Sequence, residues 1–218
     1  MTKENFSLIK PISRRSFSRR GVLVGGAIAG VSGALGFSAI TARPVKAEGT
    51  PDDIEVLNGA LYYEHQAIWA YGFAAGALSD TEVGQAVLAL ALRNQADHMA
   101  HRDALASAIS SLGGIPVMTE ESYDLSSYLE AGEGALDSDV NIAKLALALE
   151  VDAAIAYASE VAKLTAPELV MAGASIGSTE SAHATAIRAA FVSLGVDVPY
   201  VPASFVSADT REAWILKV

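Results

Sequence analysis

The sequence carries a glutamate and a histidine three residues apart in a segment that is predicted to form one long helix. The pair is Glu180 and His183, and the segment is residues 169–194. Residues three apart project from the same face of a helix, and that face also carries leucines and isoleucines at helical spacing. The carboxylate is therefore expected in the interior, where an ionised group is costly unless a cation or a hydrogen-bonding partner compensates it. The pair is a candidate for metal ligation, although one such motif alone is a weak signal.

An internal repeat strengthens that signal. Residues 64–71 align with residues 150–157 at an offset of 86, sharing the Glu, two Ala and the Tyr. Residues 95–98, which read Gln-x-x-His, align with the Glu-x-x-His of residues 180–183 at an offset of 85. Each half of the chain is thus predicted to supply one helix with a lone Glu and one with (Gln or Glu)-x-x-His. A self-similar sequence is best read as two copies of one structural unit.

Apolar periodicity predicts the elements that would position these residues. Four helices are expected at about residues 54–78, 81–112, 137–164 and 167–194, with a short helical piece at 125–130 in a long connection over 113–137. No segment after the leader described below alternates convincingly enough to predict a strand. The fold class is therefore all-α, a four-helix bundle of two helix pairs joined by a long crossover. We divide the chain into a leader (1–47), the bundle (48–195) and a tail (196–218) that packs on the bundle or on a partner subunit.

The first 47 residues resemble an export signal. Arg14 and Arg15 are followed by Phe17, an uncharged run rich in Gly, Ala, Val and Leu extends to Thr41, and Ala47 ends a small-residue cleavage site. This pattern resembles a twin-arginine (Tat) signal peptide. It implies recognition by the Tat export machinery and a periplasmic or extracellular location. An uncleaved membrane anchor is the alternative.

Removing the leader leaves a strongly acidic chain. The leader holds eight basic residues and one acidic residue, so residues 48–218 carry seven basic and 24 acidic residues, a net charge of −17. Such a surface repels nucleic acid and anionic lipid and attracts cations, so we expect no nucleic-acid partner. The chain has no cysteine, which excludes disulfides and thiolate metal sites.

The core-facing positions of the four predicted helices carry five candidate metal ligands. They are Glu64, His98, Glu150, Glu180 and His183. Carboxylate oxygens combined with two imidazoles suit iron, manganese or zinc. Taken singly, each histidine is better explained as a hydrogen-bonded structural residue and each glutamate as part of a solvated face. Neither explanation accounts for five positions matched across a repeat.

Residues from about 52 to 195 resemble the ferritin-like superfamily. More closely, residues 64–72 and the run His98-x-x-His101-Arg102-Asp103-Ala104-Leu105 resemble an uncharacterised family of secreted bacterial ferritin-like domain proteins. The superfamily resemblance implies a dinuclear site for iron or manganese and chemistry with dioxygen or peroxide. It further implies that Glu64 and Glu150 are terminal or bridging carboxylates, that Glu180 bridges, and that His98 and His183 each bind one metal.

Some residues depart from the superfamily pattern or lie near it. Gln95 stands where a second bridging Glu is expected, which leaves three carboxylates and a net charge of +1 with two divalent ions. Asp97 and His101 are candidates to compensate, although we expect both at the edge of the bundle interior. Arg102 is a candidate partner for a core carboxylate, which would disfavour a metal. Tyr71 and Tyr157 are candidates for redox activity or for hydrogen bonds to ligands, but core packing is the preferred interpretation.

Three functions remain open from the sequence. The first is an exported metalloprotein that binds one or two iron or manganese ions and acts as an oxidase or a peroxide-consuming oxidoreductase. The second is a non-catalytic metal-binding protein. The third is a stress-related structural bundle with a degenerate site, for which Gln95 is the argument. A homo-oligomer is compatible with each of them.

Overall fold

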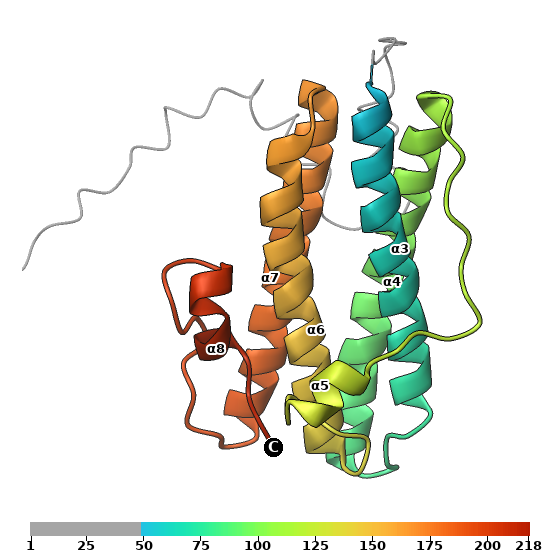
Figure 1. Cartoon of the computed structure of the whole chain (residues 1–218). Helices are drawn as coiled ribbons and strands as arrows, with labels where there is room; N and C mark the ends of the chain where they lie inside the picture. Colours follow the sequence, from blue (N-terminus) through green and yellow to red (C-terminus); the bar gives the residue numbers. More distant parts are fainter. Residues whose placement is uncertain (1–48) are drawn as a thin grey trace, which may run out of the picture. The chain divides into compact units, whose positions relative to one another are not determined.

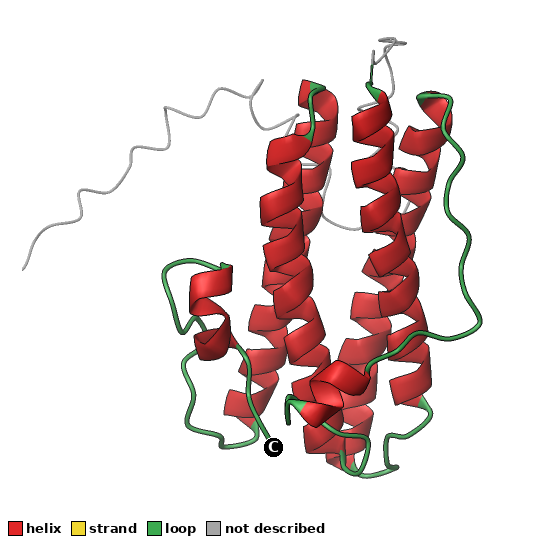
Figure 2. Cartoon of the chain, viewed as in Figure 1, coloured by secondary structure: helices red, strands yellow, loops and turns green. Residues whose placement is uncertain are grey.

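The computed structural model describes residues 49–218, and all regular secondary structure in this part of the chain is helical, with no strand (Figure 2). Four long helices dominate it: α3 (Pro51–Ala75), α4 (Glu82–Ser111), α6 (Asp139–Glu160) and α7 (Pro167–Ser193). Shorter pieces are α5 (Ser126–Glu130), η1 (Val161–Lys163), η2 (Ala208–Thr210) and α8 (Arg211–Trp214). The prediction of an all-helical chain is confirmed. The predicted leader, residues 1–47, lies outside the described residues.

Capping residues set where the long helices begin. Thr50 and Asp53 form a reciprocal capping box at α3, and Pro51 occupies the first turn. Thr81 caps α4 and Ser138 caps α6, each accepting a backbone N–H three residues on. The first predicted helix was too long at its C-terminus: α3 ends at Ala75, directly before a glycine, rather than near residue 78.

The long helices pack as two antiparallel pairs, α3 with α4 and α6 with α7 (Figure 1). A tight contact in the second pair positions one of the site tyrosines. A Cβ added at Gly177 of α7 would lie 2.9 Å from the Cβ of Tyr157 on α6, so only glycine lets the two backbones approach this closely. The connection between the pairs runs back along the α3–α4 side and carries α5 (Figure 1).

The C-terminal segment packs on α6 and α7. Trp214 and Ile215 are buried with Leu147, Val151 and Ala184 in one apolar cluster. The guanidinium of the buried Arg188 on α7 fixes the segment, because its Nε donates to the Pro199 carbonyl at 2.9 Å and its Nη1 to the Trp214 carbonyl at 2.5 Å.

The apolar core is interrupted by a polar layer. One apolar cluster joins Leu57, Leu61, Leu105 and Ile109 with residues of α7. A second joins α6, α7 and the C-terminal segment. On α4, His98 and His101 fall between Leu90, which packs on the second cluster, and Leu105 of the first. On α7, Glu180 and His183 fall between Ile176 of the first cluster and Ala184 of the second. The bundle therefore encloses its candidate site at mid-length. Within residues 49–218, none of the helices is both long and apolar enough to cross a bilayer.

Candidate metal centre

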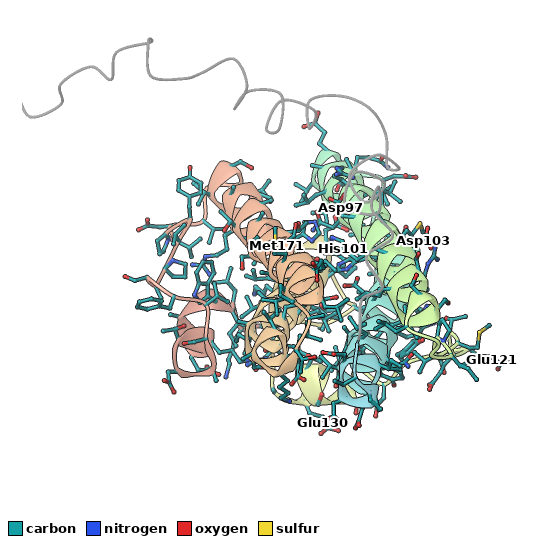
Figure 3. All side chains as sticks on the ribbon, turned by 90° about the horizontal axis from the view of Figure 1, so that it is seen from above. Asp97, His101, Asp103, Glu121, Glu130 and Met171 are labelled. Atoms are coloured by element: carbon teal, nitrogen blue, oxygen red, sulfur yellow. The ribbon has the colours of Figure 1, made fainter. Side chains whose placement is uncertain are left out.

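Six acidic and imidazole side chains converge from all four long helices. They are Glu64 on α3, His98 and His101 on α4, Glu150 on α6, and Glu180 and His183 on α7. Five of them are buried, with at most 5% of the residue exposed, and the His101 side chain is 13% exposed. Figure 3 looks along the bundle and shows His101 in the space between α4 and α7, with Asp103 on the outer side of α4.

The six side chains form two overlapping groups of four. Glu64 and His101 belong to one group, Glu150 and His183 to the other, and His98 and Glu180 belong to both. Within each group the nearest ligand atoms all lie within 4.8 Å of one another. Each group has the ligand types that could hold a metal ion, and the two groups share two side chains.

The ring of His98 spans the two groups. Its Nδ1 lies 2.8 Å from Glu64 Oε2, and its Nε2 lies 3.2 Å from Glu150 Oε1. Glu180 spans them from the opposite helix, with Oε1 3.0 Å from His101 Nδ1 and Oε2 3.2 Å from His183 Nδ1. An imidazole and a carboxylate thus occupy the two shared positions.

Two tyrosines orient the carboxylates of Glu64 and Glu150 through hydrogen bonds that run from one helix pair to the other. The hydroxyl of Tyr157 on α6 donates to Glu64 Oε1 at 2.5 Å, and the hydroxyl of Tyr71 on α3 donates to Glu150 Oε1. The Asn94 amide donates to the Tyr71 hydroxyl at 3.0 Å. Each carboxylate is therefore oriented by a residue of the opposite pair, which holds the two halves of the site in register.

The carboxylates and imidazoles shift each other's pKa values. Burial alone would raise the pKa of Glu64, but His101 and His98 bring it down to about 2. Glu150, facing His183 and His98, has its pKa lowered further, whereas burial raises the pKa of Glu180.

The pKa values of the three histidines are raised. Burial would lower the pKa of each imidazole, but the neighbouring carboxylates raise that of His101 to about 9 and that of His183 to about 10. The pKa of His98 is also raised well above its usual value. Without a metal, three acids thus lie among three protonated histidines, so the charges of the cluster roughly balance.

The fit of a metal can be tested on the buried polar atoms. Over residues 49–218, two buried side-chain polar atoms have no hydrogen-bond partner: His101 Nδ1 and Glu180 Oε1. They lie 3.0 Å apart but are not oriented to bond each other. Orphaned buried polar atoms are rare and call for an explanation. Both are good ligands for iron or manganese, and a cation between them would satisfy both, so the residues present fit the metal that the sequence resemblance implies.

The structure brings the five sequence-predicted ligands together, but it corrects the register of α4. Gln95 points out of the cluster, and its amide donates to the Ile68 carbonyl at 2.9 Å. The motif of α4 that faces Glu180-x-x-His183 is therefore His98-x-x-His101, at an offset of 82. Residues three apart share a helical face, so the sequence pattern could not distinguish this register from the one beginning at Gln95.

Four neighbouring residues make contacts that the preferred interpretations did not include. His101 lies inside the cluster rather than at its edge. Arg102 bonds the adjacent Asp103, with Nη2–Oδ1 at 2.8 Å, and not a core carboxylate. Tyr71 and Tyr157 are core residues, as preferred, but their hydroxyls bond the site carboxylates instead of water.

The sequence pattern does not single out Asn94, and it makes Asp97 only a candidate to compensate for Gln95. The amide of Asn94 is buried beside Tyr71, and Asp97 Oδ2 lies 3.3 Å from His183 Nε2. A polar residue one turn before His98 was the available signal for Asn94. Asp97 also pairs with Arg93 at 2.6 Å, an i,i+4 contact that reads from sequence as an ordinary surface pair.

Comparisons with known proteins agree with this architecture. The family model of the ferritin-like domain matches residues 52–193. The chain belongs to the ferritin-like domain family. This ferritin-like protein is also similar to the crystal structure of a conserved hypothetical protein from Mycobacterium tuberculosis, with a TM-score of 0.54 and 22% identity over 63% of this chain and 96% of that chain. At that identity the likeness concerns the fold alone. No curated protein matches the chain.

Proposed function

We propose that this ferritin-like protein binds two divalent ions, iron or manganese, in the cluster and uses them to react with dioxygen or peroxide. The observation that carries the proposal is the pair of overlapping four-residue groups sharing His98 and Glu180. Glu64 and His101 would hold one ion, and Glu150 and His183 the other. A bound pair of such ions supplies electron transfer to an oxygen species.

The residues around the ligands prepare the cluster for that role. Tyr157 and Tyr71 fix the rotamers of Glu64 and Glu150 before any metal arrives, which reduces the ordering cost of binding. Burial of the ligands excludes bulk water and strengthens their attraction for a cation. Asp97 accepts from the outer nitrogen of His183 at 3.3 Å, and such a contact fixes which nitrogen is free to coordinate.

A second candidate is a structural, non-catalytic bundle with a degenerate site. One observation favours it: the metal-free cluster satisfies most of its own charge, because Glu64 and Glu150 pair with histidines at 2.8–3.2 Å. A fold stabilised this way does not require a metal. A neutral imidazole, His98, in a shared position favours a degenerate site, whereas Gln95 bonds the Ile68 carbonyl outside the cluster.

Export through the twin-arginine route is part of the same proposal. The route suits proteins that fold, and often acquire a cofactor, before crossing the membrane. The supporting residues are Arg14 and Arg15 with the apolar run after them. Replacing both arginines by lysine should abolish export, and the exported protein should begin near Glu48. Export that persists in the double-lysine variant would contradict this assignment.

The metal proposal is tested by elemental analysis of protein purified from its native compartment. We expect about two iron or manganese ions per chain and a large loss in Glu180→Ala, which removes a ligand common to both groups. Glu168→Ala, an exposed acid at the start of α7, is the matched control and should retain the metal. Equal metal content in both variants would rule the cluster out as the site, and metal-free parent protein would favour the structural candidate.

A further inference from the structure

A long groove lies between α3 and α6. Its volume is about 850 Å³, and residues of both helices line it along most of their length. A water molecule takes up about 30 Å³ of the liquid, and pockets for small organic ligands span roughly 300–1,000 Å³. The groove is therefore far larger than dioxygen or peroxide requires, and its size matches an organic molecule.

The floor of the groove is the candidate metal centre. Glu64, His98 and Glu150 line it, together with the tyrosines that bond the two carboxylates. The walls beside them are built from small residues, among them Ala60, Ala67, Ala153 and Ala156. A molecule in the groove would thus lie against smooth apolar walls with the metal ligands beneath it.

The space beside the helix is open at Gly59. A Cβ added there would have no neighbouring atom within 4 Å, although the residue lines the groove. Because no side chain of the described protein occupies this part of the groove, it is available to a ligand.

The two ends of the groove differ in chemistry. At the end where α3 begins and α6 ends, the lining residues are Asp52, Glu55, Glu160 and Lys163. Lys163 Nζ is paired with Glu160 Oε1 at 2.6 Å, which leaves Asp52 and Glu55 as the unbalanced charges of this mouth. At the opposite end, beside α5, the lining is apolar, with Leu125, Leu136, Leu145 and Tyr128.

We propose that the groove binds a single-chain amphiphile, a molecule with one long apolar chain and a neutral or cationic head group. The chain would lie along the alanine walls with its tail toward α5 and its head at the acidic mouth. A middle segment of the chain then passes over Glu64 and Glu150. This inference rests on the proposed function, since it names the class of substrate presented to the metal centre.

The geometry disfavours a second copy of the protein as the occupant. An α-helix with its side chains is about 10–12 Å across, whereas Glu64 and Glu150 at the floor are only 2% exposed. A two-fold interface with parallel grooves would also bring the acidic mouths together, where they repel. A narrow flexible chain meets neither obstacle.

The test measures binding of dodecylamine, dodecanoate and butylamine to the purified exported protein by calorimetry, below the concentrations at which the amphiphiles aggregate. Dodecylamine should bind one to one, and each methylene removed should weaken binding about fourfold, so butylamine should not bind measurably. Dodecanoate should bind about tenfold more weakly, because its head meets an acidic mouth. Equal affinity for dodecylamine and butylamine would overturn the proposal.

Three variants locate the site. Gly59→Phe fills the open part of the groove and should weaken dodecylamine binding at least about tenfold, because it removes apolar contact with several methylenes. Ser107→Phe, at an exposed position on α4, is the matched control and should leave binding unchanged. Glu55→Lys should reduce the ratio of the affinity for dodecylamine to that for dodecanoate. Unchanged binding in Gly59→Phe, or a dimer that this variant dissociates, would overturn the assignment.

Metal content is measured separately in every variant. The groove variants replace no ligand, so they should retain the metal. Amphiphile binding by a protein that takes up no metal would reject the proposed function alone. A metal-loaded protein that binds no amphiphile would reject only the present inference.

Discussion

His98 connects the two halves of the candidate centre. Its two ring nitrogens face Glu64 and Glu150 at 2.8 and 3.2 Å, opposite the shared carboxylate of Glu180. A neutral imidazole in this position leaves three carboxylates for two divalent ions. The resulting excess of one positive charge weakens loading relative to a four-carboxylate centre.

Replacing His98 by Glu should convert the cluster to four carboxylates. Without metal, the variant should be less stable by about 3–5 kcal/mol, because it breaks buried ion pairs and crowds four acids together. Manganese should then raise its unfolding midpoint more than that of the parent. Thermal unfolding with chelator and with manganese measures both effects.

Gln95→Glu is the control for that experiment. Its side chain lies outside the cluster and bonds the Ile68 carbonyl, so the metal-induced shift should match that of the parent. A larger shift in Gln95→Glu than in His98→Glu would restore the register predicted from the sequence and contradict the structure.

Metal uptake should release protons. The pKa values of His101 and His183 are raised to about 9 and about 10, so both are protonated at neutral pH, whereas a metal ligand must be the neutral imidazole. Affinity should therefore rise with pH until those pKa values are passed. A pH-stat titration with manganese at pH 7 should show on the order of three protons released per chain. Metal affinity that is constant between about pH 6 and pH 8 would contradict the protonated cluster.

At the scale of the elements, Asp53 joins the start of α3 to the loop before α7. It is fully buried, and it accepts from the Thr165 N–H at 2.7 Å, from the Thr165 hydroxyl at 2.6 Å and from the Thr50 N–H at 2.8 Å. Burial alone would raise the pKa of Asp53, but these hydrogen bonds lower it overall. The ionised carboxylate therefore ties the two helix pairs together.

Asp53→Asn should lower the free energy of unfolding at pH 7 by about 1.5–3 kcal/mol, because an amide cannot accept all of these bonds. A carboxyl whose pKa is lowered on folding stabilises the fold above its unfolded pKa, and that contribution is lost as the pH falls through the folded value. The difference between parent and variant should thus shrink below about pH 4. Urea unfolding of parent and variant between pH 7 and about pH 3 measures this difference in unfolding free energy, with the exposed Asp52→Asn as the control. Equal losses of unfolding free energy in Asp53→Asn and Asp52→Asn would contradict the role of Asp53 in linking the helix pairs.

The long helices were predictable because each carries both an apolar face and end signals. Thr81 and Ser138 begin two of them, and the short α5 was found at nearly its observed bounds. The start of α3 at Pro51, capped by Thr50, lies three residues before the start predicted at residue 54. The sequence could not show whether Gln95 or His101 faces α7 together with His98, because both registers put His98 on the inner face of α4. The hydrogen bonds of Tyr71 and Tyr157 to the site carboxylates could not be predicted either. Their partners are far apart in the sequence, by 79 positions for Tyr71 and 93 for Tyr157.

At the scale of the whole molecule, the bundle holds a polar layer between two apolar clusters and leaves a groove on its α3–α6 side. The apolar clusters supply the stability, so the layer between them is free to carry costly buried charge. The groove gives that layer a route to the outside that is wide enough for an organic molecule. The metal centre and its access thus follow from one arrangement of the same four helices.

The most direct test of this account is anomalous X-ray scattering from crystals of the manganese-loaded or iron-loaded protein, measured at the absorption edge of the metal. We expect two peaks between the four long helices, each within roughly 2.0–2.2 Å of a glutamate oxygen and a histidine nitrogen. Glu64 and His101 should bind one ion and Glu150 and His183 the other, with Glu180 contacting both. No peak within the cluster, or one bound only by surface acids, would contradict the assignment of a metal centre.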